Sequence, residues 1–152
     1  MARLLTPAEA LALVPQREPF RFVDEILELD DERAVGAYRW PEGAAFYAGH
    51  FPGHPVTPGV LLLECMAQCA VVPLALRLTH RDLDDAEAAK LHTFFSDASV
   101  EFCQVVRPGE RVVTVGRRIF WRRRKLQVEA EMRREDGVLV CSGRLAGLGV
   151  PA

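Results

Sequence analysis

The second half of the chain alternates apolar and polar side chains, as strands of a sheet with one solvated face do. The clearest alternation runs through Leu126, Val128, Ala130 and Met132. Strand-like stretches cover residues 94–106, 111–121, 126–133 and 138–148. Turn residues separate them, among them an Asp-Gly pair typical of a β-hairpin. This half is therefore predicted to form an antiparallel sheet.

The first half predicts a short helix and a pair of strands. Thr6, Pro7 and Glu9 form a helix start with a capping hydroxyl, and the helix is expected to end near Leu13. Residues 20–27 and 34–40 are rich in apolar and β-branched side chains and flank an acidic turn. They are predicted to pair as strands.

The middle of the chain predicts an ordered loop followed by a buried helix. Residues 48–59 hold six glycines and prolines, which exclude a regular helix or central strand. Residues 60–78 are apolar on nearly every side, so the helix is expected to be buried, with a kink or early end at Pro73. Residues 80–90 are polar and predict a surface connection.

Together these elements predict an α+β fold in which an antiparallel sheet covers one long buried helix. The length of 152 residues fits a single domain spanning 1–152. The buried helix is long enough to be confused with a membrane span, but Glu64, Gln68 and Pro73 interrupt it, so no span is expected.

Composition narrows the function classes further. A formal net charge of -2 argues against a nucleic-acid binder held by phosphate contacts. The four cysteines form no C-x-x-C pair, and the first residues lack the pattern of a signal peptide. We therefore expect reduced thiols and a cytoplasmic location.

Glu64 is the most informative residue, because it lies in a helix that is otherwise apolar. A buried carboxylate must be protonated, paired or open to a cavity, and desolvation raises its pKa toward that of a useful general acid. Gln68, one turn later, is placed to orient the carboxyl group. The alternative is that Glu64 marks a polar stripe on a partly exposed helix.

His50 and Gly59 supply complementary chemistry beside Glu64. His50 lies between Gly49 and Phe51, in a stiff loop that fixes an imidazole suited to removing a weakly acidic proton, although a loop histidine is more often structural. Gly59 begins the buried helix, whose free N–H groups can stabilise a developing oxyanion.

A metal site is the other chemistry open to this region. Its four potential ligands are His50, His54, Cys65 and Cys69. The two histidines lack helical spacing and the cysteines suit helix packing, so neither a metal nor a cofactor is expected.

Residues 49–68, GHFPGHPVTPGVLLLECMAQ, resemble the signature of FabZ-type 3-hydroxyacyl-acyl carrier protein dehydratases. Further similarity to the family lies in two places, namely Pro15, Arg17, Pro19, Phe20, Val23 and Asp24, and then Phe102, Val106, Pro108, Gly109 and Glu110. The resemblance spans most of the chain.

The resemblance implies a hotdog fold and the dehydration of 3-hydroxyacyl thioesters to trans-2-enoyl thioesters, in fatty acid or specialised lipid or polyketide biosynthesis. It implies that His50 removes the proton beside the thioester carbonyl, that Glu64 protonates the departing hydroxyl and that the Gly59 N–H polarises the carbonyl. His50 and Glu64 would come from different chains of a homodimer or a trimer of dimers. The substrate would be carried by an acyl carrier protein or coenzyme A.

Some positions depart from the family pattern. Gln16 stands where the family usually has histidine, and Arg21 interrupts a commonly apolar pair. A stretch that is normally basic instead holds Glu101, Cys103 and Gln104. A different basic cluster is either a solvated hairpin tip or a docking site for a carrier protein or a coenzyme A phosphate; it comprises Arg117, Arg118, Arg122, Arg123, Arg124 and Lys125.

Two alternative functions follow from the same residues. A hotdog acyl thioesterase would use Glu64 to activate water, although the His50 loop argues against it. A non-catalytic acyl-binding or assembly partner would keep the fold without turnover, although intact His50, Glu64 and Gln68 favour an enzyme.

Overall fold

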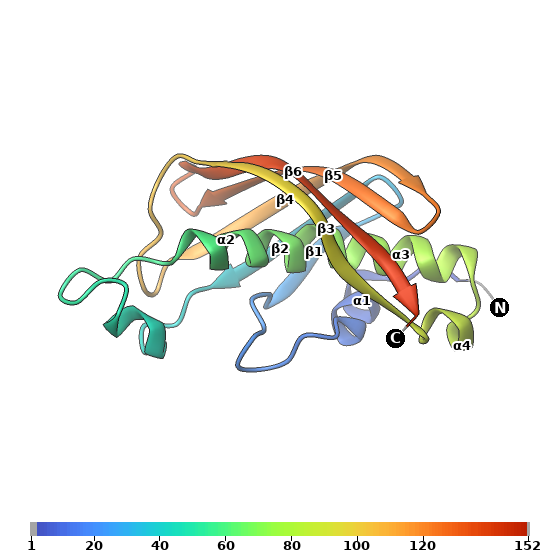
Figure 1. The fold of residues 1–152 in the computed structure, drawn as a ribbon, viewed down its shortest axis with the longest axis horizontal. Coiled ribbons are helices and arrows are strands. Elements are labelled where there is room, and N and C mark those ends of the chain that lie inside the picture. Colours follow the sequence, from blue (N-terminus) through green and yellow to red (C-terminus); the bar gives the residue numbers. More distant parts are fainter. Residues whose placement is uncertain (1–2, 152) are drawn as a thin grey trace.

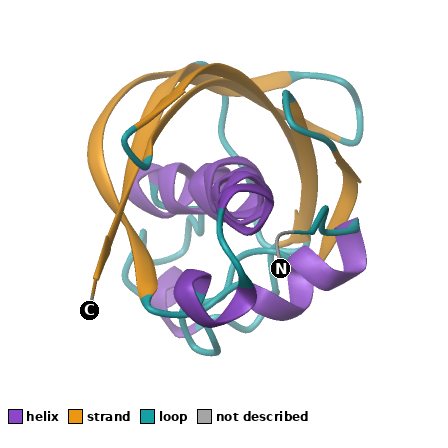
Figure 2. Ribbon diagram, turned by 90° about the vertical axis from the view of Figure 1, so that its right-hand side faces the viewer, coloured by secondary structure: helices purple, strands orange, loops and turns teal. Residues whose placement is uncertain are grey.

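One continuous helical rod runs beneath a curved sheet (Figure 1). The computed structural model describes residues 3–151. The sheet holds six antiparallel strands in the order β1-β2-β4-β5-β6-β3. Viewed along the rod, the strands curve around the helix, as predicted for a hotdog fold (Figure 2). The strands are β1 (Glu25–Leu29), β2 (Arg33–Arg39), β3 (Leu91–Phe102), β4 (Arg111–Arg122), β5 (Lys125–Arg134) and β6 (Leu139–Pro151).

The central rod is built from three consecutive helical segments. They are α2 (Gly59–Met66), the π-helical turn η2 (Ala67–Val71) and α3 (Val72–Asp82). The predicted early end at Pro73 is wrong, since the rod continues to Asp82. A widened turn directly before a proline relaxes the i→i−4 pattern that the proline ring disrupts, so the helix passes Pro73 without ending.

The rod contacts the backbone of the sheet directly at two glycines. A Cβ atom placed on Gly36 of β2 would lie 2.6 Å from Cys69 Cβ, and one on Gly116 of β4 would lie 2.5 Å from Ala70 Cβ. Only glycine permits this approach. The close packing fixes the rod against the sheet at η2, one turn beyond Glu64.

Gly59–Asp82 is long and apolar enough to cross a membrane by length and composition alone. Of its most apolar window, 67% is buried inside the fold. Its apolar character is accounted for by packing against the sheet, which is what a core helix requires.

Three shorter helices complete the part of the fold that the structure describes, and α1 (Pro7–Leu13) packs beside α3 and β1. The helix α1 begins with the predicted capping box, in which Thr6 and Glu9 bond each other's backbone N–H groups. The helix η1 (Ala45–Ala48) precedes the glycine- and proline-rich loop. The four-residue helix α4 (Asp85–Ala88) follows α3.

Several predicted boundaries need correction, among them the strand expected at 94–106, which is β3 at Leu91–Phe102. The first strand begins at Glu25, and residues 20–24 form a loop. Gln68 bonds the backbone of Phe20 and Phe22, and the Asp24 N–H group bonds Ala37 O of β2. The predicted surface connection at 80–90 contains the last turn of α3 and all of α4. His80 is buried there, with its Nδ1 2.8 Å from Asp85 Oδ1.

Candidate active site

Glu64 and Gln68 meet in the rod, one turn apart, as predicted. Gln68 is fully buried, and its Oε1 accepts a hydrogen bond from the Phe22 N–H at 2.7 Å. This contact identifies Nε2 as the donating end of the amide, which bonds Phe20 O at 3.1 Å and Glu64 Oε1 at 2.9 Å. Because Glu64 Oε1 accepts from Gln68, the proton of a neutral Glu64 carboxyl group belongs on Oε2.

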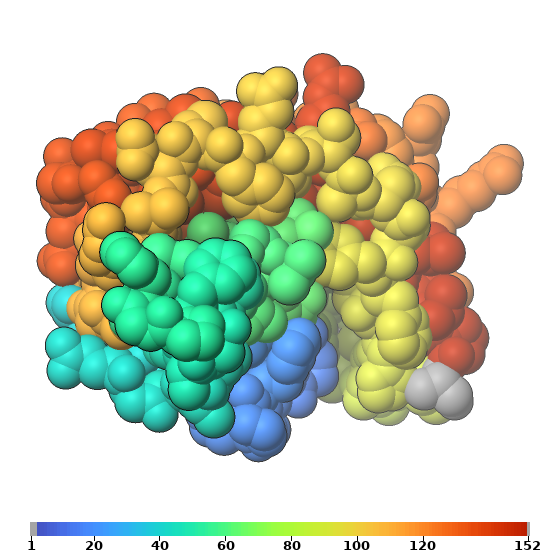
Figure 3. All heavy atoms as spheres, turned by 60° about the vertical axis from the view of Figure 1, so that its left-hand side comes forward, coloured from blue at the N-terminus to red at the C-terminus, as the bar shows by residue number. Residues whose placement is uncertain are grey.

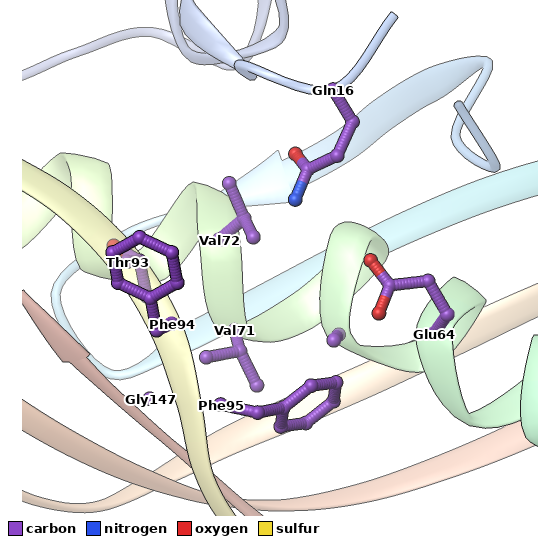
Figure 4. Close-up of a pocket in the computed structure, with 9 residues that line it drawn as sticks. Gln16, Glu64, Val71, Val72, Thr93, Phe94, Phe95 and Gly147 are labelled. Carbon is purple, nitrogen blue, oxygen red and sulfur yellow. The ribbon is translucent and has the colours of Figure 1, made fainter. Parts of the chain in front are cut away.

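The Glu64 carboxyl group faces a small cavity of about 200 Å³ (Figure 4). We call this the Glu64 cavity; it is lined by Gln16, Glu64, Ala67, Val71, Val72, Thr93, Phe94, Phe95 and Gly147. Burial raises the pKa of Glu64, and the Gln68 hydrogen bond opposes that rise without cancelling it. A carboxyl group with a raised pKa, open to an apolar cavity, is suited to donate a proton near neutral pH.

His50 lies in the loop between η1 and α2, which extends beyond the start of the rod (Figure 1). Its Nδ1 is 2.8 Å from Val56 O, and Phe51 stacks on the imidazole with ring centroids 4.1 Å apart. A carbonyl oxygen only accepts, so Nδ1 carries the proton and the neutral ring presents a lone pair at Nε2. The loop thus holds a histidine in the tautomer that a general base requires.

Gly59 is the first residue of α2, and its N-cap residue Pro58 provides no side-chain cap. The first N–H groups of a helix have no intrahelical partner, and they carry the positive end of the helix dipole. The Phe102 ring packs over this end, since a Cβ atom on Gly59 would lie 3.4 Å from Phe102 Cε1. The start of α2 therefore presents a backbone N–H group beside the Phe102 ring.

Within one chain these groups form two separate half-sites. Glu64 lines the cavity, with Gln68 bonded to it, whereas His50 and Gly59 are not among the residues that line the cavity. The hydrogen bonds of His50 run to Val56 of its own loop and to Phe46 O of η1. A single chain therefore holds an acid with an orienting amide in one place and a base in another.

The surface around the two half-sites exposes several large apolar side chains. On this face the loop 49–58, the start of α2 and the strand β3 lie side by side (Figure 3). Val60 is 75% exposed, and four aromatic side chains from the loop and β3 are exposed with it: Phe51, Phe94, Phe95 and Phe102. Apolar area of this kind marks an interaction surface.

Three features of the site were not recognised from the sequence. Phe94 and Phe95 were assigned to a strand but not to the cavity that they line. Gln16 was noted only as a departure from the family pattern. The Val56 carbonyl, which sets the His50 tautomer, gives no signal in the sequence because any residue type supplies a backbone oxygen.

Two of the four side chains considered as metal ligands have hydrogen-bond partners within the fold. Cys65 and Cys69 direct their sulfurs toward Phe22 O at 3.2 and 3.7 Å. Across residues 3–151, no group of three or more His, Cys, Asp or Glu side chains is arranged to hold a metal ion.

Comparison with known proteins gives one consistent family. Residues 14–144 match the model of the FabA-like domain. The chain is 36% identical over 138 residues to the 3-hydroxyacyl-[acyl-carrier-protein] dehydratase FabZ of Geotalea uraniireducens, covering 90% of this chain and 91% of that protein. It is 35% identical over 143 residues to the FabZ of Roseiflexus castenholzii, covering 93% and 94%.

Solved structures of low sequence identity share the fold. A dehydratase heterocomplex from Xenorhabdus doucetiae superimposes with a TM-score of 0.73 at 13% identity, covering 96% of this chain and 92% of that one. A thioesterase from Haemophilus influenzae gives 0.68 at 14% identity, covering 99% and 94%. These likenesses establish the hotdog architecture, which serves both kinds of enzyme.

Proposed function

The chain belongs to the FabA-like family as a FabZ-type 3-hydroxyacyl-[acyl-carrier-protein] dehydratase, and on this premise we propose that a second copy of the chain completes its active site. In this arrangement His50 of one copy faces Glu64 of the other. The observation that carries the proposal is the separation of the two half-sites beside an exposed apolar face. Acyl thioesters on an acyl carrier protein are the substrates.

The strand β3 is the edge through which two copies would pair. It is 12 residues long, ends the sheet and bonds only β6, so its other side presents unpaired N–H and C=O groups. The opposite edge, β1, is five residues long, bulged and carries two glutamates, which are features that discourage pairing. Antiparallel pairing of two β3 edges about a twofold axis satisfies the backbone and covers the exposed phenylalanines.

The chemistry follows from the tautomers and protonation states of the site. His50 Nε2 removes the proton from the carbon beside the thioester carbonyl, and the electron pair forms the new carbon–carbon double bond. The C3–O bond breaks, and the proton on Glu64 Oε2 passes to the departing oxygen, which leaves as water. The imidazolium and the carboxylate return to their starting states by proton exchange, so the reaction is a balanced elimination.

The reaction class is tested by following one substrate with two readouts. A 3-hydroxyacyl thioester is incubated with the protein while enoyl absorbance and free thiol are measured. Reversible formation of the enoyl thioester without thiol release is the expected result. Thiol release without enoyl formation would identify a thioesterase, and a folded protein with neither activity would identify an acyl-binding protein.

Replacing Gly59 by proline is expected to remove the oxyanion donor and leave the helix in place. Proline is accepted at the first helical position, and Pro58 has an extended ψ of 134° that is compatible with a following proline. We expect kcat to fall by about 10²–10³-fold, the usual cost of one such donor. Gly59→Ala keeps the N–H group and should lose far less; equal activity of the two variants would reject the role of the amide.

The β4–β5 hairpin tip, Arg122–Lys125, is proposed as the docking site of the carrier protein. Among the described residues, ion pairs are found for Lys125, which bonds Asp97, but not for the three arginines. Arg123 and Arg124 hold left-handed φ angles of 50° and 62°, where such turns normally place Asn-Gly. Leu148, which lines the groove beside the tip, directly follows Gly147 of the Glu64 cavity in β6, so the groove and the cavity lie against opposite faces of the same strand.

Charge reversal at the tip separates carrier docking from catalysis. Replacing Arg122, Arg123 and Arg124 by glutamate is expected to raise KM for a carrier-linked substrate about tenfold at low salt, because a basic patch steers an acidic partner. The same acyl group on pantetheine should keep its KM. Arg133→Glu, at the other end of β5, is the matched control. A parallel loss with both substrates would exclude a docking role.

A further inference from the structure

Gln16 presents an unsatisfied amide to the Glu64 cavity. Its Oε1 is buried and has no hydrogen-bond partner among residues 3–151. Figure 4 shows the Gln16 amide and the Glu64 carboxyl group directed toward the same space. Leaving a buried polar atom unpaired costs stability, so an orphaned amide in a cavity indicates a ligand group that completes it.

The segment that carries Gln16 is held by two arginines. Arg21 donates to Gln16 O at 3.3 Å and to Leu11 O, in the last turn of α1, at 3.2 Å. Arg17 donates to Gln16 O at 3.1 Å and also to Val14 O. The backbone of Gln16 is therefore fixed relative to α1, while its side chain is left free for another partner.

Gln68, which orients Glu64, has no capacity left to satisfy the Gln16 amide. Gln68 uses Oε1 for the Phe22 N–H and Nε2 for Phe20 O and Glu64 Oε1. The other residues around the cavity are mainly apolar. In this structure none of the cavity residues bonds Gln16 Oε1, so a polar group of a bound substrate can take that place.

We propose that Gln16 holds the 3-hydroxyl group of the substrate, and the water formed from it, beside Glu64. This inference rests on the proposed function. A hydroxyl group donates one hydrogen bond and accepts others, which matches a primary amide with one acceptor and two donor hydrogens. With its O–H bonded to Gln16 Oε1, the substrate oxygen directs a lone pair toward Glu64 Oε2, from which the departing oxygen receives its proton.

The test compares ligands with and without the hydroxyl group. In a His50→Ala background, which prevents turnover, dissociation constants are measured for a 3-hydroxyacyl thioester and for the saturated thioester of the same length. Gln16→Leu, which removes the amide at similar size, is expected to weaken the hydroxylated ligand about tenfold, the worth of one hydrogen bond, and to leave the saturated ligand unchanged. Gln127→Leu on β5 is the matched control, since Gln127 does not line the cavity.

Kinetics of the otherwise parental enzyme supply a second readout. Gln16→Leu should lower kcat/KM about tenfold, and Gln16→His, which restores a donor and an acceptor, should recover part of that loss. Unchanged affinity for the hydroxylated ligand, or an equal loss for both ligands, would overturn the role of Gln16. If the parental protein bound both ligands but turned over neither, the proposed function would fail while the ligand comparison still decided the role of Gln16.

Discussion

An equimolar mixture of the His50→Ala and Glu64→Gln variants, reassorted by mild unfolding and refolding, is expected to recover about a quarter of parental activity. Each variant alone should lose about 10²–10⁴ in kcat, because each lacks one partner of the proton transfer. Random reassortment makes half of the dimers mixed. Each mixed dimer carries one site with both native side chains and one site with neither.

The complementation assay distinguishes a shared site from a site within one chain. If His50 and Glu64 acted within the same chain, no chain in the mixture would hold both groups and activity would not return. His54→Ala is the matched control for the loop, because His54 lies four residues from His50 and has no assigned role. Circular dichroism before and after reassortment establishes that inactive samples are folded.

Much of the fold could be predicted because local patterns and global packing agree. The alternation in β5 matches its burial, with Leu126, Val128 and Met132 facing the core. The Asp-Gly pair occupies its predicted turn, where Gly137 has a φ of 85°. The helix, apolar on nearly every side, needed a partner that covers much of its surface, and a curved sheet wraps around it (Figure 2).

The errors in three segments have different causes, and only one of them depends on a contact between residues far apart in the sequence. Residues 20–24 are apolar enough for a strand, but Gln68 bonds Phe20 and Phe22 from a position 46–48 residues away and holds them as a loop. The expectation of a kink or an early end at Pro73 did not include a π-helical turn before the proline, with which the helix continues. His80 is buried by its contact with Asp85, although the surrounding sequence is polar.

The roles of Glu64 and Gln68 could be predicted from the sequence, because a single carboxyl group in an otherwise apolar helix is expected to be functional. Glu64 and Gln68 are one turn apart, so helical geometry alone brings them together. The base half depends on a different chain in the proposed dimer, and sequence spacing carries no information on that distance. Gln16 was missed because its significance lies in the absence of a partner, which only coordinates reveal.

Placing a charge on the free edge of β3 is expected to abolish activity by preventing assembly. Ala98 is exposed near the middle of β3. In a dimer paired through this strand, Ala98→Lys brings two like charges close together across a desolvated interface. Natural edge strands often carry lysine, which prevents such pairing. Light scattering should show the mass falling to that of one chain, 16.9 kDa, and kcat should fall by about 10²-fold or more because both half-sites are incomplete.

The other edge of the same sheet provides the control. Leu27→Lys places the same charge on β1, where Leu27 is also exposed and the strand is short and bulged. This variant should keep the parental mass and activity. An Ala98→Lys protein that stayed associated and active would show that β3 is not the assembly edge. A monomeric Ala98→Lys protein with parental kcat would show that one chain supplies the complete site, and the half-sites seen here would then have to be joined by movement of the His50 loop toward the Glu64 cavity.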